Sequence, residues 1–444
     1  MVAFDRMTVR SLSVALTLLV LGAAPPLGAQ QMGTAQHDVP RPVTPPVLPL
    51  DDIRFLSDDR LGGRLTGSPG ADTAAAYLAR RFQAVGLQPA AGGWFQTFTI
   101  ARDAPVAQHA HVAGLKGSNV IGLLPGRDPI LRNEALIVGA HYDHLGLGGF
   151  GSLDPDSTGK VHNGADDNAS GAAMLIRIAE RLAANPPART VVFIAFSGEE
   201  LGLLGSAYYV KQPIYPLSTT LAMINLDMVG RLRQKRLIVY GAQTAKEFPA
   251  LLDSLNWYAG LDLHAQGDGY GPSDQSSFYA AGRPVLHFFT DLHEDYHRTT
   301  DDWQKINVEG FGQVAGFVTG LVTALANRPG PLTTVTAATP PASTGTSSPE
   351  HASPGYGAYL GTVPDMTDNP GGVRLLGVRA GSPAEKAGLR GDDVITRIGD
   401  MNVPDLQAMT NALRSHQPGD TVEITVKRGS DVTTLRATLG TRGG

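Results

Sequence analysis

The sequence of 444 residues contains no cysteine, and this absence excludes disulfides, thiolate zinc sites, cysteine nucleophiles and iron–sulfur clusters. Any bound metal must therefore be held by histidine, aspartate and glutamate. No run of lysine or arginine dominates, and the formal net charge is −5, so we expect no nucleic-acid partner. Apolar residues make up 42% of the chain, which is enough for a buried core and rules out global disorder.

Long apolar runs are absent beyond the N-terminus. There, Arg6 and Arg10 precede an apolar stretch at 11–24, and small residues follow as far as Ala29. This order is typical of a secretory signal peptide over 1–29, because the apolar stretch is shorter than the roughly 20 residues that span a bilayer. An uncleaved N-terminal anchor is the alternative. We expect an exported protein, periplasmic or secreted, with no membrane span in the mature chain.

Composition divides the rest of the chain. A Pro-rich lead-in at 30–50 precedes the main domain at 51–328, and a linker of Pro, Thr, Ser and Ala at 329–354 precedes a second unit at 355–444. In the main domain, helical periodicity occurs at 74–85, ending at Gly86, and again at 172–183, whereas short apolar runs predict strands at 135–140, 191–196, 221–226, 237–240 and 284–289. This alternation predicts an α/β domain whose mixed sheet is mostly parallel, with helices on both faces.

Polar side chains follow three of these predicted strands at the points where the strands end. His141 follows the first strand, Glu199 and Glu200 follow the second, and Asp227 follows the third. Ligands bind beyond the carboxyl ends of strands in open α/β sheets, so we expect these side chains to share one edge. Each acidic residue alone could merely end a turn or cap a helix, but such a coincidence at several strand ends indicates a metal site.

The motifs that carry these residues resemble the co-catalytic di-zinc aminopeptidase family, which includes bacterial leucyl aminopeptidases and is related to glutaminyl cyclases. Five motifs occur in the family's order: A-H-Y-D-H-L-G (140–146), N-G-A-D-D-N-A-S-G (163–171), S-G-E-E-L-G-L-L-G-S (197–206), N-L-D-M-V-G (225–230) and Y-H-R-T-T-D-D (296–302). The match covers most of residues 51–328. The resemblance implies a zinc-exopeptidase fold of the phosphorylase/hydrolase-like type.

The resemblance also implies roles for individual residues. Asp166 is expected to bridge two Zn²⁺ ions, for which Co²⁺ or Mn²⁺ are substitutes, and a cis peptide bond is expected between Asp166 and Asp167. The first ion is completed by His141 and Asp227, and the second by Glu200 and His297. The expected general base is Glu199, Asp143 orients the ring of His141, and Tyr270 or Tyr296 is the oxyanion donor.

A second metal motif competes with this assignment. His293-Glu294-Asp295-Tyr296-His297 matches the zincin pattern H-E-x-x-H, which requires a helix that places both histidines on one face. The flanking residues lack helical apolar periodicity. A single-metal site here would also leave His141, Asp166 and Asp227 unexplained, so we favour the two-metal assignment.

The C-terminal unit carries motifs of its own. G-S-P-A-E-K-A-G-L (381–389) followed by G-D-D-V-I (391–395) resembles the PDZ domains that accompany bacterial proteases. The resemblance implies a small α+β domain that binds a C-terminal peptide as an added strand, with Tyr359, Leu360 and Gly361 in the carboxylate-binding loop. A docking or stabilising domain without a free peptide ligand is the alternative.

Together these features predict an exported zinc-dependent aminopeptidase. It would hydrolyse N-terminal residues from peptides or proteins, with water activated by two metals and a glutamate base. Two other readings stay open. One is a different zinc enzyme of the same fold, such as a glutaminyl cyclase or a carboxypeptidase-like enzyme, and the other is a catalytically dead peptide-binding scaffold.

Overall fold

The structure is a computed structural model that describes residues 49–102, 111–149, 151–267, 269, 271–335, 358–364, 371–378, 381–404, 408–409, 412–413 and 415–440. The predicted signal peptide, almost all of the Pro-rich lead-in and most of the predicted linker lie outside these residues, as does Tyr270. The predicted domain boundaries stay predictions.

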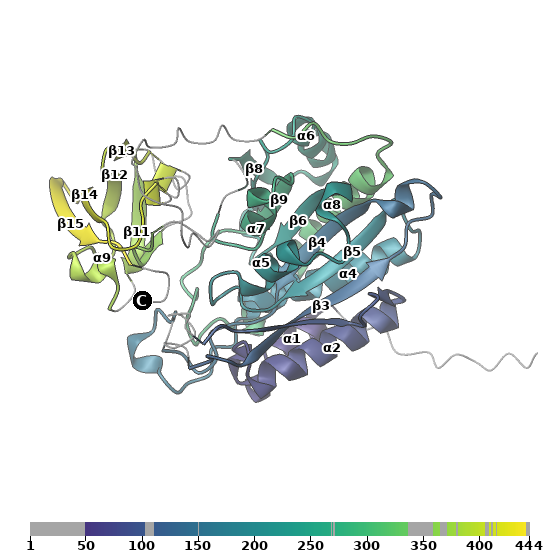
Figure 1. Ribbon diagram of the computed structural model, residues 1–444, viewed down its shortest axis with the longest axis horizontal. Coiled ribbons are helices and arrows are strands. Elements are labelled where there is room, and N and C mark those ends of the chain that lie inside the picture. Colours follow the sequence, from purple (N-terminus) through teal and green to yellow (C-terminus); the bar gives the residue numbers. More distant parts are fainter. Residues whose placement is uncertain are drawn as a thin grey trace, which may run out of the picture. The chain divides into compact units, whose positions relative to one another are not determined.

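A nine-stranded mixed sheet forms the centre of the N-terminal domain (Figure 1). Its strands are β1 (Gln88–Pro89), β2 (Phe95–Thr99), β3 (Lys116–Leu124), β4 (Ala135–His141), β5 (Thr190–Phe196), β6 (Thr220–Leu226), β7 (Arg236–Tyr240), β8 (Asp262–Gln266) and β9 (Val285–Phe289). The order is β1-β3-β5-β4-β6-β9-β7-β8, and β2 pairs with β3. The neighbours β5, β4, β6 and β9 run parallel, as do β7 and β8, whereas the other pairs are antiparallel. The predicted α/β fold class is confirmed.

Seven α-helices and several short turns of helix are described in this domain. The α-helices are α1 (Pro49–Leu56), α2 (Pro69–Val85), α4 (Gly171–Ala183), α5 (Leu204–Lys211), α6 (Phe248–Ala259), α7 (Gln275–Ala280) and α8 (Val308–Asn327). The short turns are η1 (Asp59–Arg64), η2 (Leu131–Asn133), η3 (Pro155–Ser157), η4 (Ala165–Ser170), η5 (Leu217–Thr219) and η6 (Trp303–Lys305). Helix α2 begins where Ser68 Oγ accepts the N–H of Ala71, and it ends at Gly86 in the left-handed conformation, as its sequence predicts.

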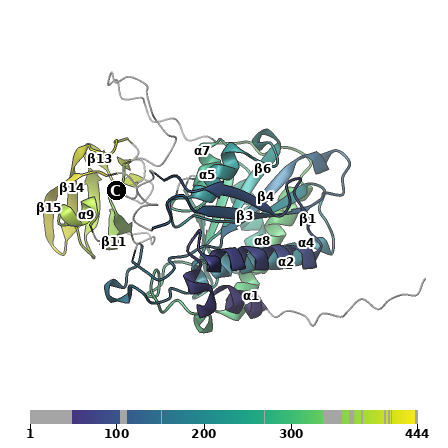
Figure 2. The same ribbon diagram turned by 60° about the horizontal axis from the view of Figure 1, so that its bottom comes forward.

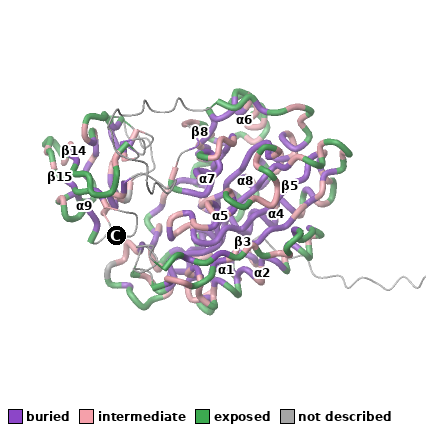
Figure 3. The backbone as a smooth tube through the Cα atoms, viewed as in Figure 1, coloured by how far each residue is buried: buried purple, intermediate pink, exposed green. Residues whose placement is uncertain are grey.

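Helices cover both faces of the sheet because the strands alternate their side chains. In β4, Leu136 and Val138 join the core formed with α2, α4 and α8, whereas Ile137 packs in a second core with Tyr209 of α5 and Phe278 of α7. Figure 2 shows α2, α4 and α8 on one side of the strands and α5 and α7 on the other. The central strands and α4 are buried (Figure 3), so the polar strand ends stand on a rigid base.

Helix α8 is the one helix among the described residues that is long and apolar enough to cross a membrane by length and composition. Such a helix is weak evidence for a span, since core helices pass the same test. Its apolar residues include Phe311, Val318 and Leu325, which are buried in the core with α4. This packing favours a core helix.

The C-terminal unit contains a six-stranded antiparallel sheet with its own core. Its elements are β10 (Thr362–Pro364), β11 (Val373–Val378), α9 (Pro383–Lys386), β12 (Val394–Ile398), β13 (Met401–Asn402), β14 (Thr421–Arg428) and β15 (Asp431–Thr438). The order is β10-β11-β12-β14-β15, and β13 pairs with β12. Leu375, Ile395 and Ile424 are fully buried between the sheet and the segments that cover it.

Candidate metal centre

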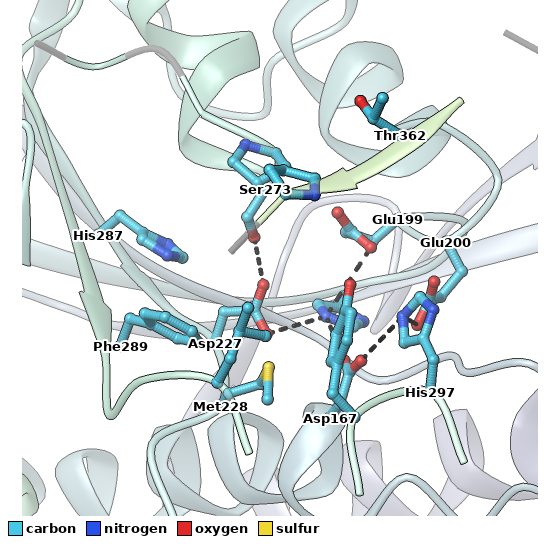
Figure 4. Close-up of a pocket in the computed structure, with 15 residues that line it drawn as sticks. Asp167, Glu199, Glu200, Asp227, Met228, Ser273, His287, Phe289, His297 and Thr362 are labelled. Carbon is cyan, nitrogen blue, oxygen red and sulfur yellow. Dashed lines mark hydrogen bonds and ion pairs between the residues drawn. The ribbon is translucent and has the colours of Figure 1, made fainter. Parts of the chain in front are cut away.

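Six acidic and histidine side chains meet at the carboxyl ends of the central parallel strands. His141 ends β4, Glu199 and Glu200 follow β5, and Asp227 follows β6. Asp167 comes from the turn η4 before α4, and His297 comes from the loop after β9. Figure 4 shows Asp167, Glu199, Glu200, Asp227 and His297 directed toward one another in a single pocket, which His141 also lines. The prediction that separate strand ends converge on one edge therefore agrees with the structure.

Asp167, and not Asp166, lies between the two histidines. Asp167 Oδ1 is 3.4 Å from His141 Nε2, and Asp167 Oδ2 is 3.2 Å from His297 Nε2. Asp166 points elsewhere: its Oδ1 accepts the N–H of Gly230 at 2.7 Å, and its Oδ2 lies 3.2 Å from His293 Nε2. The expectation for Asp166 is thus corrected by one residue, because the irregular backbone of η4 sends adjacent side chains in different directions.

The expected position of the cis peptide bond is also wrong by one residue. The resemblance placed it between Asp166 and Asp167, and the structure has it between Asp167 and Asn168. In the expectation and in the structure alike, the cis bond follows the aspartate that is assigned to face His141 and His297. The offset in the ligand and the offset in the peptide bond therefore have one origin, which is the register of the motif at 163–171.

The ligand atoms form two groups that each have the size of a metal site. His141, Asp167 and Asp227 make one group, and His144, Asp167 and Glu200 make the other. His141 Nε2 is 3.3 Å from Asp227 Oδ1, and His297 Nε2 is 3.3 Å from Glu200 Oε1. A tetrahedral zinc ion with bonds of about 2.0–2.1 Å holds its ligand atoms about 3.4 Å apart. The donor types and their spacing therefore fit two zinc ions that share Asp167.

His144 is a residue that our sequence reasoning did not single out. Its Nδ1 lies 3.0 Å from Glu200 Oε1 and 3.8 Å from Asp167 Oδ2, and its ring meets that of His297 edge-on. Nε2 of His144 is buried and has no partner among the residues that the structure describes. The signal was visible in H-Y-D-H (141–144), where a second imidazole stands three residues after the first. Two imidazoles therefore compete for the place beside Glu200.

Asp143 contacts the ring of His141 chiefly through its main chain. His141 Nδ1 is 3.2 Å from the carbonyl oxygen of Asp143 and 3.8 Å from its carboxylate. The carboxylate instead accepts hydrogen bonds from Thr66 Oγ1 and from the backbone N–H of Glu199. Asp143 thus connects the β4 loop to the β5 loop. The expectation that it orients His141 remains a prediction about function.

Burial and mutual charge dominate the electrostatics of the cluster. Burial opposes protonation of His297, but Glu200 and Asp167 outweigh it and raise the pKa of His297 to about 10. Burial likewise opposes protonation of His141, yet Asp227 and Glu199 raise its pKa well above the usual range. Without metal, the neighbouring carboxylates thus favour the protonated forms of His141 and His297. Divalent cations would supply the same positive charge, which is why such clusters release protons when they bind metal.

Glu199 differs from its neighbour Glu200. Burial raises the pKa of Glu199 well above the usual range, although His141 partly opposes the shift. For Glu200, burial raises the pKa, but His297 and His144 outweigh it and hold the pKa well below the usual range. Glu199 Oε2 lies 3.9 Å from His141 Nε2. Adjacent carboxyl groups with opposite proton affinity are typical of a base beside a ligand.

Asp301 holds the backbone on which Asp167 stands. Its Oδ2 accepts the N–H groups of Asp166 and Asp167 at 2.9 and 3.0 Å, and its Oδ1 accepts from Arg231 at 2.9 Å. Asp301 is fully buried. The carboxylate thus sets the direction of the Asp167 side chain, a contact that the motif Y-H-R-T-T-D-D contains but does not reveal.

Arg64 is fully buried behind the cluster and has no carboxylate partner within hydrogen-bond distance among the described residues. Its guanidinium donates to the carbonyl oxygens of Tyr142, Asn163 and Gly164, and also to that of Leu56. The carbonyls of Tyr142, Asn163 and Gly164 belong to the segments that precede Asp143 and Asp167, whereas that of Leu56 ends α1. Burial lowers the pKa of Arg64 to about 10, and Asp143 and Asp167 oppose that shift. No sequence pattern pointed to this role.

The remaining expectations concern Tyr296, Tyr270 and the H-E-x-x-H segment. Tyr296 lines the pocket and stacks on His297 with ring centroids 3.9 Å apart, which leaves its oxyanion role a prediction. Tyr270 is outside the described residues. The H-E-x-x-H segment is a succession of turns rather than a helix, so the zincin geometry is absent from it.

The predicted peptide-binding loop of the C-terminal unit precedes its edge strand. Tyr359 pairs with Gly440, and Leu360 is buried in the core, where its carbonyl accepts the N–H of Ala384. Gly361 has φ of +82°, and a Cβ atom there would lie 2.3 Å from that of Ser382. Strand β10, which follows, stands at the end of the sheet order, where an added strand would pair.

An α/β protein with a centre of imidazoles and carboxylates is the class that fold and site define. Within that class, residues 119–322 match Peptidase family M28, and residues 358–439 match the PDZ domain. Residues 119–322 are therefore similar to the peptidases of family M28, and the unit that follows them is similar to a PDZ domain. The family resemblance in the sequence is confirmed.

Two curated relatives share this domain. Leupeptin-inactivating enzyme 1 of Streptomyces exfoliatus is 28% identical over 59% of this chain and 53% of its own length. Aminopeptidase YwaD of Bacillus subtilis is 30% identical over 46% of this chain and 44% of its own length. The chain therefore spans about half the length of the curated relatives that it matches.

A solved structure shows the same fold. The glutaminyl cyclase of Bacteroides thetaiotaomicron, bound to N-acetylhistamine, superposes with a TM-score of 0.51 at 18% identity. The match covers 62% of this chain and 96% of that one. At this identity the similarity supports the fold alone.

Proposed function

We propose that the chain is an exported aminopeptidase that uses two zinc ions and Glu199 to hydrolyse N-terminal residues from peptides. The observation that carries the proposal is the position of Asp167. Its two oxygens face separate imidazoles at 3.4 and 3.2 Å, and each imidazole is accompanied by a further carboxylate, Asp227 or Glu200. A carboxylate shared in this way is typical of two-metal hydrolases.

Zinc, Glu199 and Asp143 have different roles in the proposed reaction. When bound, zinc supplies Lewis acidity that lowers the pKa of water in its coordination sphere from about 15.7 toward about 7. Glu199 accepts the proton of the attacking water on its carboxylate and donates it to the leaving amine. The high proton affinity that burial gives Glu199 suits this task. Asp143 contributes by fixing the backbone N–H of Glu199 and contacting Nδ1 of His141.

The lining of the pocket favours an aminopeptidase over a carboxypeptidase. Its charged residues among those described are acidic or histidine, and they include Glu199, Glu200 and Asp227. No lysine or arginine is among these lining residues. A free C-terminal carboxylate needs a cationic partner, whereas the free N-terminal ammonium of a substrate is attracted to this acidic pocket.

The decisive test compares the wild-type chain with Glu199→Gln on peptides with free and blocked N-termini. We expect chelator-sensitive release of the N-terminal residue from free peptides only, and a loss of roughly 10²–10⁴-fold or more in kcat for the variant. Zinc content of both proteins should stay at two ions per chain, measured by elemental analysis. Retained activity in the variant would refute the role of Glu199 as the general base.

The alternatives give different results in the same assay. Cyclisation of N-terminal glutamine without peptide cleavage indicates a cyclase, and zinc bound without any turnover indicates a scaffold. The two ligand groups that share Asp167 favour two metals and thus the peptidase. Identification of a mature N-terminus after Ala29 in the periplasm or medium would support export.

The PDZ domain is proposed to bind a C-terminal peptide as a strand along β10. Its place at the end of the sheet order supports this proposal. The full-length protein should bind peptides with a free C-terminal carboxylate and should not bind their amidated counterparts. Equal affinity for both forms would refute recognition of the carboxylate.

A further inference from the structure

His287 stands in the wall of the pocket, apart from the candidate metal ligands. It lies in β9 and its side chain is almost fully buried, with 4% of its surface exposed. Figure 4 places His287 and Phe289 on one side of Asp227, Met228 below it, and Glu199, Glu200 and His297 on the other side. The pocket thus has an acidic half and a largely apolar half, and His287 belongs to the apolar half.

A hydrogen-bond network determines which nitrogen of His287 carries the proton. Asn225 Nδ2 is 2.8 Å from Ser273 Oγ, 3.0 Å from Gln275 Oε1 and 3.0 Å from His287 Nδ1. Ser273 donates its only hydrogen to Asp227 Oδ2 at 2.7 Å, so its oxygen must accept from Asn225. The amide group of Asn225 therefore presents nitrogen, and not oxygen, to this part of the network.

The orientation of Asn225 favours one tautomer for His287. The two amide hydrogens of Asn225 are shared among three acceptors, and an amide nitrogen accepts no hydrogen bond. A hydrogen on Nδ1 would therefore face no acceptor, which favours the tautomer with its hydrogen on Nε2. The doubly protonated ring is disfavoured for the same reason. Burial also lowers the pKa of His287 to about 4, although Asp227 opposes the shift. The ring is therefore neutral at pH 7 and offers one N–H donor.

That donor has no partner among the described residues. The hydrogen bonds found for His287 there involve Nδ1, and the ring is flanked by Tyr240 and Phe289. Its neighbours in the pocket wall include Met228 and Leu292, which offer no strong acceptor. Because His287 lines the pocket, this N–H is open to a molecule in the cavity, where a ligand can supply the acceptor.

We propose that His287 is a specificity-determining residue that donates its Nε2–H to a carbonyl on the side chain of the substrate's N-terminal residue. The preferred side chain is an uncharged carboxamide, that of asparagine or glutamine. A carboxylate would be repelled by Asp227, and an ammonium group has no lone pair to accept the hydrogen. The inference rests on the proposed aminopeptidase function and gives it a substrate class.

The test uses pairs of peptides that differ only in whether the first side chain can accept a hydrogen bond. Asparagine and leucine have nearly the same shape, as do glutamine and methionine. For the zinc-loaded full-length protein, we expect kcat/KM to favour the amide member of each pair. In His287→Phe the preference should fall by about tenfold, the effect of one buried hydrogen bond.

Two further variants separate recognition from packing. His287→Gln keeps an N–H near the position of Nε2 and should retain most of the preference. Phe289→Leu changes the same wall without removing a donor, so it should alter both members of a pair in parallel. Zinc content, measured for every variant, should stay at the wild-type value.

The results that overturn the inference are distinct from those that overturn the function. A preference that His287→Phe leaves unchanged within twofold, or a wild-type preference for leucine over asparagine, refutes the role of His287. If no peptide is hydrolysed although zinc is bound, the proposed function fails. Binding of the same peptide pairs to Glu199→Gln and Glu199→Gln/His287→Phe by calorimetry then still decides the role of His287.

Discussion

Replacing Asp167 with asparagine tests the centre of the proposed site, and the neighbouring Asp166→Asn variant is its matched control. Asp167 presents oxygens to His141 and His297 at 3.4 and 3.2 Å, whereas Asp166 bonds to Gly230 and contacts His293. An asparagine at 167 keeps one oxygen but directs an NH₂ group at the other position. It also removes the negative charge that two cations would share.

The magnitude follows from the burial of the site. Removing one partner of a buried charged group costs about 3–5 kcal/mol, which corresponds to about 10²–10⁴-fold in affinity. We therefore expect Asp167→Asn to bind at most one zinc ion per chain and to lose hydrolysis by a comparable factor. Asp166→Asn should bind two ions, because its remaining oxygen can still accept the N–H of Gly230.

The effect of Asp167→Asn on the stability of the metal-free protein should differ from its effect on zinc binding. Burial, reinforced by Glu200, raises the pKa of Asp167. A pKa that is higher in the folded state means that the folded protein holds the proton more tightly, so stability declines as pH rises above the unfolded pKa near 3.9. At pH 7 the buried anion is destabilising without metal. Asp167→Asn should therefore leave the Tm of the metal-free protein unchanged or raise it.

The assays are elemental analysis after dialysis, zinc titration against a competing chelator, and thermal unfolding with and without zinc. Loss of zinc together with a retained metal-free Tm separates a ligand from a residue that only supports the fold. If Asp166→Asn loses zinc while Asp167→Asn keeps two ions, the assignment of the shared ligand is wrong.

Three further predictions concern residues outside the ligand set. Asp301→Asn should weaken zinc binding by about 10–100-fold, the usual effect of a supporting residue, because Arg231 would then face an amide; unchanged affinity in the chelator titration would contradict this. Arg64→Met should lower the Tm by several degrees at any zinc concentration, since it leaves backbone carbonyls buried without donors; a wild-type melting curve would contradict it. Burial raises the pKa of Asp393, but the hydrogen bond from Arg428 outweighs burial and holds that pKa below its usual range. The pair therefore stabilises the C-terminal unit above about pH 4, and the effect is lost as pH falls further. Asp393→Asn should thus cost about 1.5–3 kcal/mol at pH 7 and little at pH 2; urea unfolding monitored in that unit would show a pH-independent difference if this reasoning fails.

Much of the fold could be predicted from local patterns. Strands β4, β5 and β6 begin and end within about one residue of the predicted apolar runs, because a strand buried on both faces needs such a run. Antiparallel strands such as β2 and β3 were not predicted. Their burial is partial, and their pairing depends on residues that are distant in the chain.

Some residues of the candidate site could likewise be predicted from local patterns, whereas others could not. His141, Glu200 and Asp227 follow directly from strand ends, where the direction of the chain is set by the sheet. His144 and Asp301 act across loops, and Arg64 binds backbone carbonyls that carry no residue identity. Such contacts have no periodic signal, since any sequence with suitable loop geometry can supply a carbonyl oxygen.

The sequence by itself determined the class of metal donor, the edge of the sheet where the donors gather and the family. These properties depend on residue type and on strand direction, both of which are local. Only the tertiary structure decided that Asp167 faces the histidines in place of Asp166, and that Nδ1 of His287 faces the amide group of Asn225. Both depend on the path of the backbone and on hydrogen bonds between strands and loops far apart in the chain, which residue types alone do not specify.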